Sequence, residues 1–287
     1  MKALVGRDYA KGTLTRYETS YKHTMSFLQS RYEVSDIDIN KLDYDFITEY
    51  EFWLKSVRKC DHNTTMKYLS NFKKIVNRCV RNGKLQRDPF LGFSMAKKEV
   101  ERHALTETQL KTIAQKQFKI ERLSIVRDIF LFCCFTGLAY ADVKKLKQSE
   151  ITDGIDGEKW IIAKRQKTDI TSKIPLLPHA LQIIRKYENN IECQLTNKVL
   201  PVLSNQKMNS YLKEIGDACG IHIHLTFHIA RHTFATTVTL TNGVPIETVS
   251  KMLGHKNLQT TQHYAKILDK KISEDMKKLK SYSLYKN

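Results

Sequence analysis

The residues of this chain that could do chemistry stand in four short groups in its second half. They are Arg165 with Lys167, His228 with Arg231, His255, and Tyr264. Breaking a phosphodiester without a metal ion requires a nucleophile, fixed cationic donors for the non-bridging oxygens, and an acid for the leaving oxygen. Phenol, guanidinium, imidazole and ammonium groups can together supply all three. The sequence therefore predicts phosphoryl transfer.

Each group has a role that follows from its chemistry. Tyr264 can be the nucleophile, although a phenol with a pKa near ~10 needs a base or a strongly positive setting to attack at neutral pH. Arg231 suits the oxygens because its fork donates two parallel hydrogen bonds to a phosphate. His228 stands three residues before Arg231 at a predicted helix start, so both can meet one phosphate. Lys167, in a polar hairpin turn, can protonate the leaving oxygen.

The elements that must position these groups can be read from the pattern around them. A capping box at residues 106–109 starts a second domain, and the apolar run 125–135 predicts a helix that ends at Thr136-Gly137. A short helix at 140–147 follows. Strand signals at Ile151, at 160–163 and at 174–176 predict a small three-stranded antiparallel sheet. Helices resume near Pro178, and one of them runs from about His228 to Asn242-Gly243.

The first half has a helical pattern and a basic face. Helices are expected near 13–31, 43–59 and 64–82, the third with Asn63 as N-cap and Gly83 as its stop. The other face of that third helix carries Lys67, Lys73, Lys74, Arg78 and Arg81, and Lys97 and Lys98 follow in a segment without a clear period. Such a row is either a solvated face or a surface that contacts phosphates. We count all of these residues except Arg81 as candidate DNA contacts.

Together these features predict a mainly helical protein of two domains. We expect residues 1–12 to be a tail or the remnant of a linker, 13–98 a helical DNA-binding domain, 99–104 a linker, and 105–287 the catalytic domain. The six cysteines form no Cys-x-x-Cys pair and are expected to be reduced thiols.

Charge indicates the class of partner. Lys and Arg number 48 against 30 Asp and Glu, a formal charge of +18, of which +7 falls in residues 1–100 and +11 in the remainder. A surplus of that size suits a polyanion, with nucleic acid as the first candidate. A solvated basic surface or an anionic membrane surface is the alternative. No apolar run is long enough to span a membrane, and the polar start at 1–12 leads us to expect a cytoplasmic protein.

Three segments resemble a known family. They are His228-Ile-Ala-Arg231-His232-Thr-Phe-Ala-Thr, Met252-Leu-Gly-His255 and Thr260-Thr-Gln-His-Tyr264-Ala. In order and spacing they resemble the second signature box and the nucleophile segment of tyrosine recombinases. Residues 132–143 resemble the first box, and 13–98 the core-binding domain. The residues of the first box are most similar to those of integrases of conjugative transposons and phages of Bacteroides-type bacteria.

The resemblance implies a fold, a reaction and partners. The fold would be a helical, SAM-like core-binding domain followed by a larger helical domain with a small sheet, the DNA breaking-rejoining fold. Tyr264 would be the nucleophile, Arg231 the second catalytic arginine, His228 and His255 phosphate and proton-transfer partners, and Lys167 the hairpin lysine. Cleavage would leave a 3′-phosphotyrosine and a free 5′ hydroxyl, with no ATP, metal or other cofactor.

The implied partner is double-stranded DNA at attachment or core sites. The protein would be a monomer in solution and a tetramer on paired sites, helped by accessory DNA-bending and excision factors. The tail at 270–287 would dock on a neighbouring protomer or fray.

One residue departs from the family pattern. The first box normally reads Thr-Gly-Leu-Arg, and here Ala139 stands at the arginine position. Losing that donor should cost ~3 kcal/mol of transition-state stabilisation, by analogy with oxyanion-hole deletions. We favour Arg165 as the substitute, because residues two apart on a strand share a side and Arg165 would lie beside Lys167. Arg127 is the runner-up, although it stands about 18 Å along a helix from Ala139.

Other readings stay open at this point. Asp142, at the family's acidic position in the first box, either orients a catalytic cation or caps the following helix. Ala139 also permits a DNA-binding protein of the same fold with weak or no catalysis. A zinc site drawn from His222, His224, His228, His232, His255 and His263 lacks a supporting Cys or acidic pattern. A type IB topoisomerase shares the chemistry, but the compact domain at 13–98 disfavours it.

Overall fold

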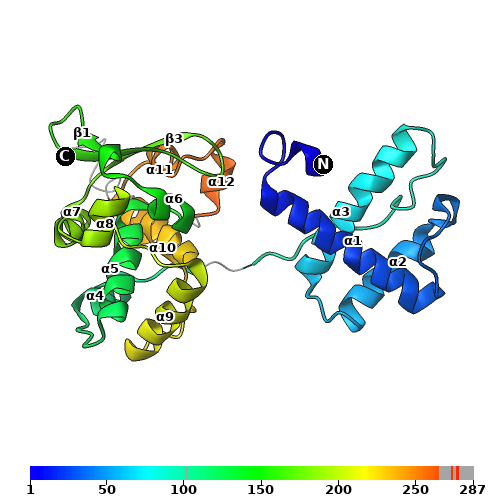
Figure 1. Ribbon diagram of the computed structural model, residues 1–287, viewed down its shortest axis with the longest axis horizontal. Coiled ribbons are helices and arrows are strands. Elements are labelled where there is room, and N and C mark those ends of the chain that lie inside the picture. Colours follow the sequence, from blue (N-terminus) through cyan, green and yellow to red (C-terminus); the bar gives the residue numbers. More distant parts are fainter. Residues whose placement is uncertain (101–102, 265–272, 274–275, 278–287) are drawn as a thin grey trace, which may run out of the picture. The chain divides into compact units, whose positions relative to one another are not determined.

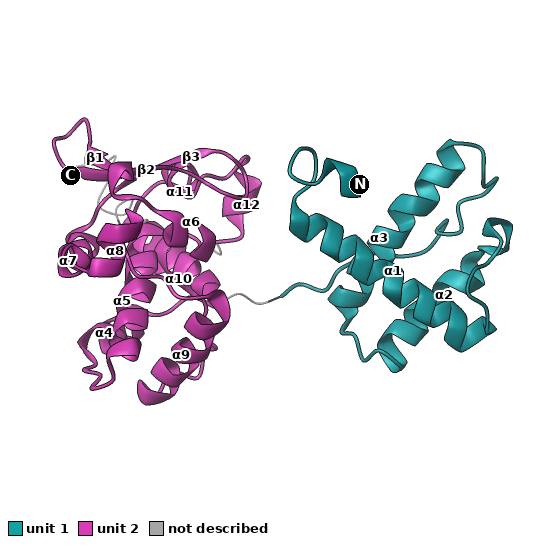
Figure 2. Ribbon diagram, in the orientation of Figure 1, with its two compact units in different colours: residues 1–101 teal, residues 102–287 magenta. Residues whose placement is uncertain are grey.

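The computed structural model describes residues 1–100, 103–264, 273, 276 and 277. The chain divides into two compact units, residues 1–101 and 102–287 (Figure 2). The tail that we expected to dock on a neighbour, residues 270–287, lies outside the described residues except at 273, 276 and 277. Within the described residues no helix has the length and apolar character needed to cross a membrane.

The first unit is built of three α-helices around an aromatic core. The helices are α1 (Lys11–Tyr32), α2 (Tyr44–Ser56) and α3 (His62–Arg81). Phe27 of α1 stacks on Tyr50 of α2 with ring centroids 4.8 Å apart, and Phe46 stacks on Phe72 of α3 at 6.0 Å. Because each helix contributes rings to the same core, the apolar faces of all three are covered.

The start of α3 differs from the prediction. Asp61, not Asn63, is the N-cap: its side chain accepts the Thr64 N–H at 2.7 Å. The Asn63 side chain donates to the Lys98 carbonyl and accepts the Lys98 N–H, both at 2.9 Å. Two residues with good capping side chains stand two apart, and the contact with Lys98, 35 residues away, decides which one caps. The predicted stop is confirmed, since Gly83 follows the helix with φ of 70°.

The second unit is mostly helical, with one small sheet (Figure 1). Its α-helices are α4 (Glu107–Gln115), α5 (Glu121–Thr136), α6 (Tyr140–Lys145), α7 (Pro178–Tyr187), α8 (Ile191–Thr196), α9 (Asn205–Ala218), α10 (Phe227–Thr233), α11 (Ile246–Met252) and α12 (Gln259–Gln262). Its strands are β1 (Ile151–Asp153), β2 (Lys159–Lys164) and β3 (Thr171–Pro175), antiparallel in the order β1-β2-β3. The predicted fold class is confirmed.

Helix α5 is the centre of the second unit. It packs against α7, α9 and α10, and eleven of its residues are buried. A helix surrounded in this way needs no polar stripe, which explains the apolar run at 125–135. It ends at Gly137, whose φ is 68° and whose missing side chain leaves room for Phe234. The predicted capping box at Thr106 and Gln109 is confirmed at the start of α4.

The helix that begins before His228 is not one regular helix. Helix α10 ends at Thr233, a π-helix follows over Phe234–Thr239, and a 3-10 turn over Leu240–Asn242 leads to Gly243 with φ of 83°. The hydroxyl of Thr239 donates to the carbonyls of Phe234 and Ala235, at 2.9 and 2.8 Å. Hydrophobic periodicity locates such a helix but does not reveal a change in its hydrogen-bond ladder.

Candidate active site

The candidate active site is assembled from four parts of the second unit: the β2–β3 hairpin, α10, the turn after α11, and the end of α12. Tyr264 follows α12 and is only 7% exposed, packed with Phe234, Val249 and Leu253. Its backbone N–H donates to the Thr261 carbonyl at 2.8 Å, which fixes the chain where the phenol projects. The predicted nucleophile is therefore held between helical elements.

Imidazole rings surround the Tyr264 ring. His232 contacts it with centroids 4.7 Å apart, and His255 lies nearly parallel to it at 6.0 Å. The exposed ring of His228 meets His232 edge to face at 4.4 Å. His232 was not among the predicted catalytic residues. Its position four residues after His228 on one helix face was the signal that could have found it.

Arg231 is buried and anchored by backbone oxygens. It donates to the Gly137 carbonyl through Nη1, and through Nη2 to the Leu253 carbonyl at 2.6 Å and to His255 Nε2 at 3.0 Å. Burial, and next the charge of Arg165, lower the pKa of Arg231 to about 10, while Tyr264 opposes this by charge and by a side-chain hydrogen bond. The guanidinium remains charged at neutral pH and faces the phenol.

The contacts of His255 define its tautomer. Because a guanidinium only donates, Nε2 of His255 accepts from Arg231, and Nδ1 therefore carries the proton and donates to Thr261 Oγ1 at 2.8 Å. Burial, and then the charges of Arg231, Arg165 and Lys167, lower the pKa of His255 to about 4. His255 is thus neutral at pH 7, and its Nε2 is a proton acceptor.

Arg165 lies inside the site, but not for the predicted reason. Strand β2 ends at Lys164, and the hairpin turns at once, with Asp169 at φ of 56° donating its N–H to the Arg165 carbonyl. Arg165 is 8% exposed, whereas Lys167 is exposed in the turn. The expectation that the two extend side by side on a strand is therefore wrong. Lys167 still acts on the site, since its charge lowers the pKa of His255.

The Arg165 side chain is fixed by three acceptors. Its Nε donates to Asp142 Oδ2 at 3.4 Å, and its Nη1 donates to the carbonyls of Leu253 at 2.9 Å and Gly254 at 3.3 Å. A side chain on Gly254 would collide with it, because an added Cβ would lie 2.5 Å from Arg165 Cδ. The glycine in the Leu-Gly-His segment thus makes room for a buried arginine.

Asp142 orients Arg165 and does not cap α6. Besides Arg165, its carboxylate accepts the Gln166 N–H at 2.9 Å, so it holds both the arginine and the start of the turn that presents Lys167. Helix α6 has Ala139 at its N-cap, with no side-chain capping bond. Ala139 lies between Gly137, which accepts from Arg231, and Asp142, which accepts from Arg165. Arg231 and Arg165 are thus anchored by residues on either side of Ala139, the position at which the family pattern has an arginine.

Arg127, the runner-up, is engaged elsewhere. Its guanidinium donates to Asp128 Oδ1 at 2.9 and 2.7 Å and to the Lys116 carbonyl, and it lies over the Phe118 ring. Asp128 also accepts from Lys186 and from the Tyr187 hydroxyl. Arg127 therefore belongs to a buried polar network around Asp128, and its contacts do not include the residues around Tyr264.

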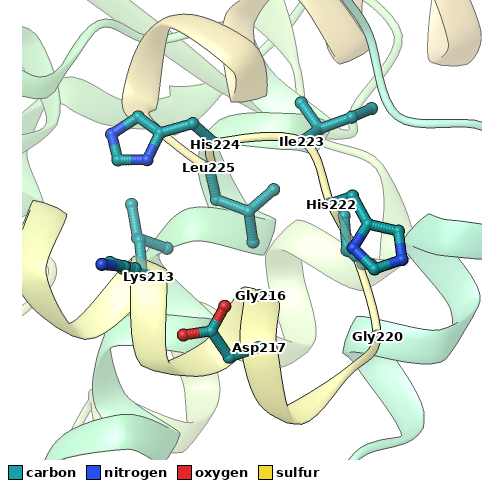
Figure 3. Close-up of a pocket in the computed structure, with 10 residues that line it drawn as sticks. Lys213, Gly216, Asp217, Gly220, His222, Ile223, His224 and Leu225 are labelled. Carbon is teal, nitrogen blue, oxygen red and sulfur yellow. The ribbon is translucent and has the colours of Figure 1, made fainter.

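The histidines before α10 line a separate pocket. The pocket has a volume of about 360 Å³ and lies between α9 and residues 221–225. Figure 3 places the rings of His222 and His224 at opposite ends of it. Within residues 1–100 and 103–264, no three His, Cys, Asp or Glu side chains gather where they could hold a metal ion. The zinc alternative thus has no ligand cluster in this part of the chain.

The basic residues of α3 separate into two sets. Lys67, Lys74 and Arg78 are exposed and, at seven and four residues apart, share one face of the helix. Lys73 lies off that face, with its ammonium over the Phe90 ring at 5.0 Å. Lys97 and Lys98 are exposed in the segment that Asn63 ties to the start of α3. We call Lys67, Lys74 and Arg78 the α3 stripe.

Comparison with known proteins covers both units. Residues 2–100 match the model of the phage integrase SAM-like domain, and residues 103–271 match that of the phage integrase family. The tyrosine recombinase XerC of Pediococcus pentosaceus is 22% identical over an alignment of 291 positions, which covers 96% of this chain and 93% of the relative. XerA of Thermococcus onnurineus is 32% identical over 149 residues, 49% of this chain and 50% of the relative.

Solved structures share the fold. A lambda integrase dimer bound to a COC′ core site has a TM-score of 0.71 at 18% identity, covering 92% of this chain and 91% of that one. The Tn1549 transposon integrase in complex with a circular intermediate DNA has a TM-score of 0.71 at 15% identity, with coverages of 96% and 97%. A lambda integrase tetramer bound to a Holliday junction has a TM-score of 0.72 at 19% identity, with coverages of 92% and 74%.

Proposed function

Because this chain belongs to the phage integrase family, the tyrosine recombinases of site-specific DNA recombination, we propose that it cuts and rejoins DNA through Tyr264. The Tyr264 oxygen attacks the phosphorus, a 3′-phosphotyrosine ester forms, and the bond to the 5′ oxygen breaks. That oxygen takes a proton and leaves as a 5′ hydroxyl. In the second step the 5′ hydroxyl of another strand attacks the ester, and the phenol regains its proton. No metal ion takes part in either step.

The observation that carries this proposal is that Tyr264, Arg231, His232 and His255 gather at one place. The rings of His232 and His255 lie 4.7 and 6.0 Å from the Tyr264 ring, His255 accepts a hydrogen bond from Arg231, and Tyr264 raises the pKa of Arg231. The Arg231 guanidinium can donate to the phosphate oxygens as negative charge develops on them.

We propose that Arg165 supplies the second guanidinium in place of the missing first-box arginine. It is buried beside Arg231, and its charge lowers the pKa values of both Arg231 and His255. Its hydrogen bond to Asp142 fixes the direction of its side chain. Arg127 takes no part in this proposal, because its guanidinium is held by Asp128.

Protons are handled by Lys167 and the imidazoles. Lys167, exposed at the hairpin tip, protonates the leaving 5′ oxygen. His255, neutral with Nε2 as an acceptor, takes the phenol proton. His228, exposed at the start of α10, binds the phosphate together with the helix N-terminus.

The proposed substrate is double-stranded DNA at attachment or core sites, in the integration and excision of a mobile element. The α3 stripe of the first unit binds the phosphate backbone, together with Lys97 and Lys98 in the segment that Asn63 ties to the start of α3. The protein is a monomer in solution, and four protomers assemble on paired sites with accessory DNA-bending and excision factors. One of the structural relatives is itself a tetramer bound to a Holliday junction.

A suicide DNA substrate, nicked so that the cleaved strand diffuses away, tests the chemistry. Wild-type protein should form an adduct that resists SDS and that protease digestion maps to Tyr264. Tyr264→Phe should form none and still bind the substrate. Tyr211→Phe is the control, because Tyr211 lies under Arg122 and away from the site residues in its contacts.

A wild-type chain that binds core-site DNA but never forms an adduct would favour the alternative, a DNA-binding protein of this fold without efficient catalysis. Ala139 is the residue that would then account for the missing activity. An adduct that persists in Tyr264→Phe would place the nucleophile at another residue.

A further inference from the structure

The chain enters the second unit at a point that is hydrogen-bonded to the helix carrying Arg231. The Leu105 N–H donates to Thr233 Oγ1 at 3.0 Å, and Thr237 Oγ1 donates to the Leu105 carbonyl at 2.5 Å. Leu105 and Thr233 are both 0% exposed. We call these two hydrogen bonds the Leu105 contact. Through it one backbone residue is held on both sides by side chains 128 and 132 residues away.

The Leu105 contact fixes the start of the unit firmly. A buried backbone N–H or carbonyl without a partner is costly, so the two hydroxyls are needed where they are. The next residue, Thr106, forms the capping box with Gln109 that begins α4. Residues 105–109 are therefore held by hydrogen bonds to Thr233 of α10, to Thr237 of the π-helix, and within the capping box of α4.

The threonines of the Leu105 contact lie close in sequence to Arg231 and His232. Thr233 is the last residue of α10, two residues after Arg231 and next to His232. Thr237 lies in the π-helix, where the hydrogen-bond ladder changes and where irregular helices often serve function. A displacement of Leu105 would therefore act on the helix at the turn that positions Arg231.

Residues 99–104 connect Lys98, which is hydrogen-bonded to Asn63 of the first unit, to Leu105. Six residues span at most about 22 Å, so the connection limits the movement of Leu105 once both units bind one DNA molecule. The position of the connection, and hence of Leu105, then depends on how the DNA is held.

We propose that Thr233 and Thr237 are positioning residues that couple the connection between the two units to Arg231. Through the Leu105 contact, binding of DNA by both units places α10, the helix that carries Arg231, in its reactive position. This inference rests on the proposed strand cleavage by Tyr264. It predicts that removing the Leu105 contact slows cleavage without weakening DNA binding.

The test uses the full chain with Thr233→Val and Thr237→Val, which keep the shape of the side chain and remove the hydroxyl. We expect the single-turnover rate of adduct formation on a suicide substrate to fall tenfold to on the order of a hundredfold. The Kd for the same DNA should stay within about twofold. Thr233→Ser and Thr237→Ser, which keep the hydroxyl, should recover most of the rate.

Thr239→Val is the matched control. Thr239 is also a buried threonine of the π-helix, but its hydroxyl donates to Phe234 and Ala235 of its own helix. At a temperature where circular dichroism shows every variant folded, Thr239→Val should cleave at close to the wild-type rate. An equal decrease in Thr239→Val and Thr233→Val would mean that helix integrity is responsible, and would overturn the proposal.

A longer connection tests the coupling itself. Two glycines inserted between His103 and Ala104 should slow cleavage by the wild-type chain, yet add little to the defect of Thr233→Val, because both changes break the same link. If the two changes together lower the cleavage rate by the product of their separate factors, the proposal is overturned.

A readout without chemistry separates this inference from the proposed function. Wild-type protein that forms no adduct refutes cleavage by Tyr264 but leaves the coupling testable by amide hydrogen exchange. DNA binding should slow exchange at residues 229–233 in the wild type, and much less in the glycine-insertion variant. Equal slowing in both proteins would refute the coupling even if cleavage is normal.

Discussion

Arg165 and Arg231 donate hydrogen bonds to the same backbone oxygen, the carbonyl of Leu253. Nη1 of Arg165 lies 2.9 Å from it, and Nη2 of Arg231 lies 2.6 Å from it. The two buried guanidinium groups repel each other, and the charge of Arg165 lowers the pKa of Arg231. A phosphate bound between them would relieve that repulsion. The pair is therefore arranged for an anion.

Removal of Arg165 should slow cleavage strongly. Arg165→Ala is expected to lower the rate of adduct formation by about a hundredfold or more, the usual effect of losing a preorganised donor to a developing oxyanion. Arg165→Lys, which keeps the charge but not the fork, should fall between Arg165→Ala and wild type. The measurement is the single-turnover rate on a suicide substrate.

Arg127→Ala is the matched control, since Arg127 also forms a buried pair with an aspartate in the same unit. It should lower the melting temperature but leave the cleavage rate of the folded protein near wild type. Wild-type cleavage by Arg165→Ala would remove Arg165 from the mechanism.

A methyl group at Gly254 should displace Arg165. In Gly254→Ala the new Cβ would lie 2.5 Å from Arg165 Cδ and 2.7 Å from Ser172 Oγ, at a φ of 59° that strains any other residue. We expect the melting temperature to fall and the cleavage rate to drop toward that of Arg165→Ala. Gly220→Ala, with a similar φ but open space around it, should lose stability alone. Equal cleavage defects in the two variants would contradict this account.

The depressed pKa of His255 predicts how stability depends on pH. Its pKa is about 4 in the folded chain and near 6.5 when unfolded, so between these values the unfolded state binds more protons. The free energy of unfolding should therefore fall as pH decreases from 6.5 to 4, and this contribution is complete above pH 6.5. Urea titrations across this range should show a weaker fall for His255→Asn than for wild type. His224→Asn, at an exposed histidine, should follow the wild type.

The α3 stripe should determine the salt dependence of DNA binding. For each phosphate that the protein no longer neutralises, the slope of log K against log salt should become shallower by about 0.9, whatever the DNA sequence. The combined variant Lys67→Ala, Lys74→Ala, Arg78→Ala should therefore bind more weakly and with a shallower slope. Lys73→Ala should change neither much, because Lys73 is half-buried and lies off the face of the stripe. An unchanged slope in the combined variant would place the DNA-binding face elsewhere.

Several elements could be predicted because their signals are local. The capping box at Thr106, the glycine stop at Gly137 and the three short strands depend on neighbours within a few residues, and each is present in the structure. The choice of Asp61 over Asn63 as N-cap and the change from α10 to a π-helix could not be predicted. Both are decided by bonds that are absent from the local pattern, such as that between Asn63 and Lys98.

The sequence by itself determined the kinds of chemistry present and their order, because the spacing of His228, Arg231, His255 and Tyr264 is a property of the chain. Only the tertiary structure decided which of the two candidate arginines, Arg165 or Arg127, lies beside Arg231. Arg165 reaches Leu253 across 88 residues, while Arg127 turns to the adjacent Asp128. The physical reason is that a buried guanidinium goes where acceptors can satisfy it. Those acceptors are carbonyls and carboxylates that come together only when the helices pack.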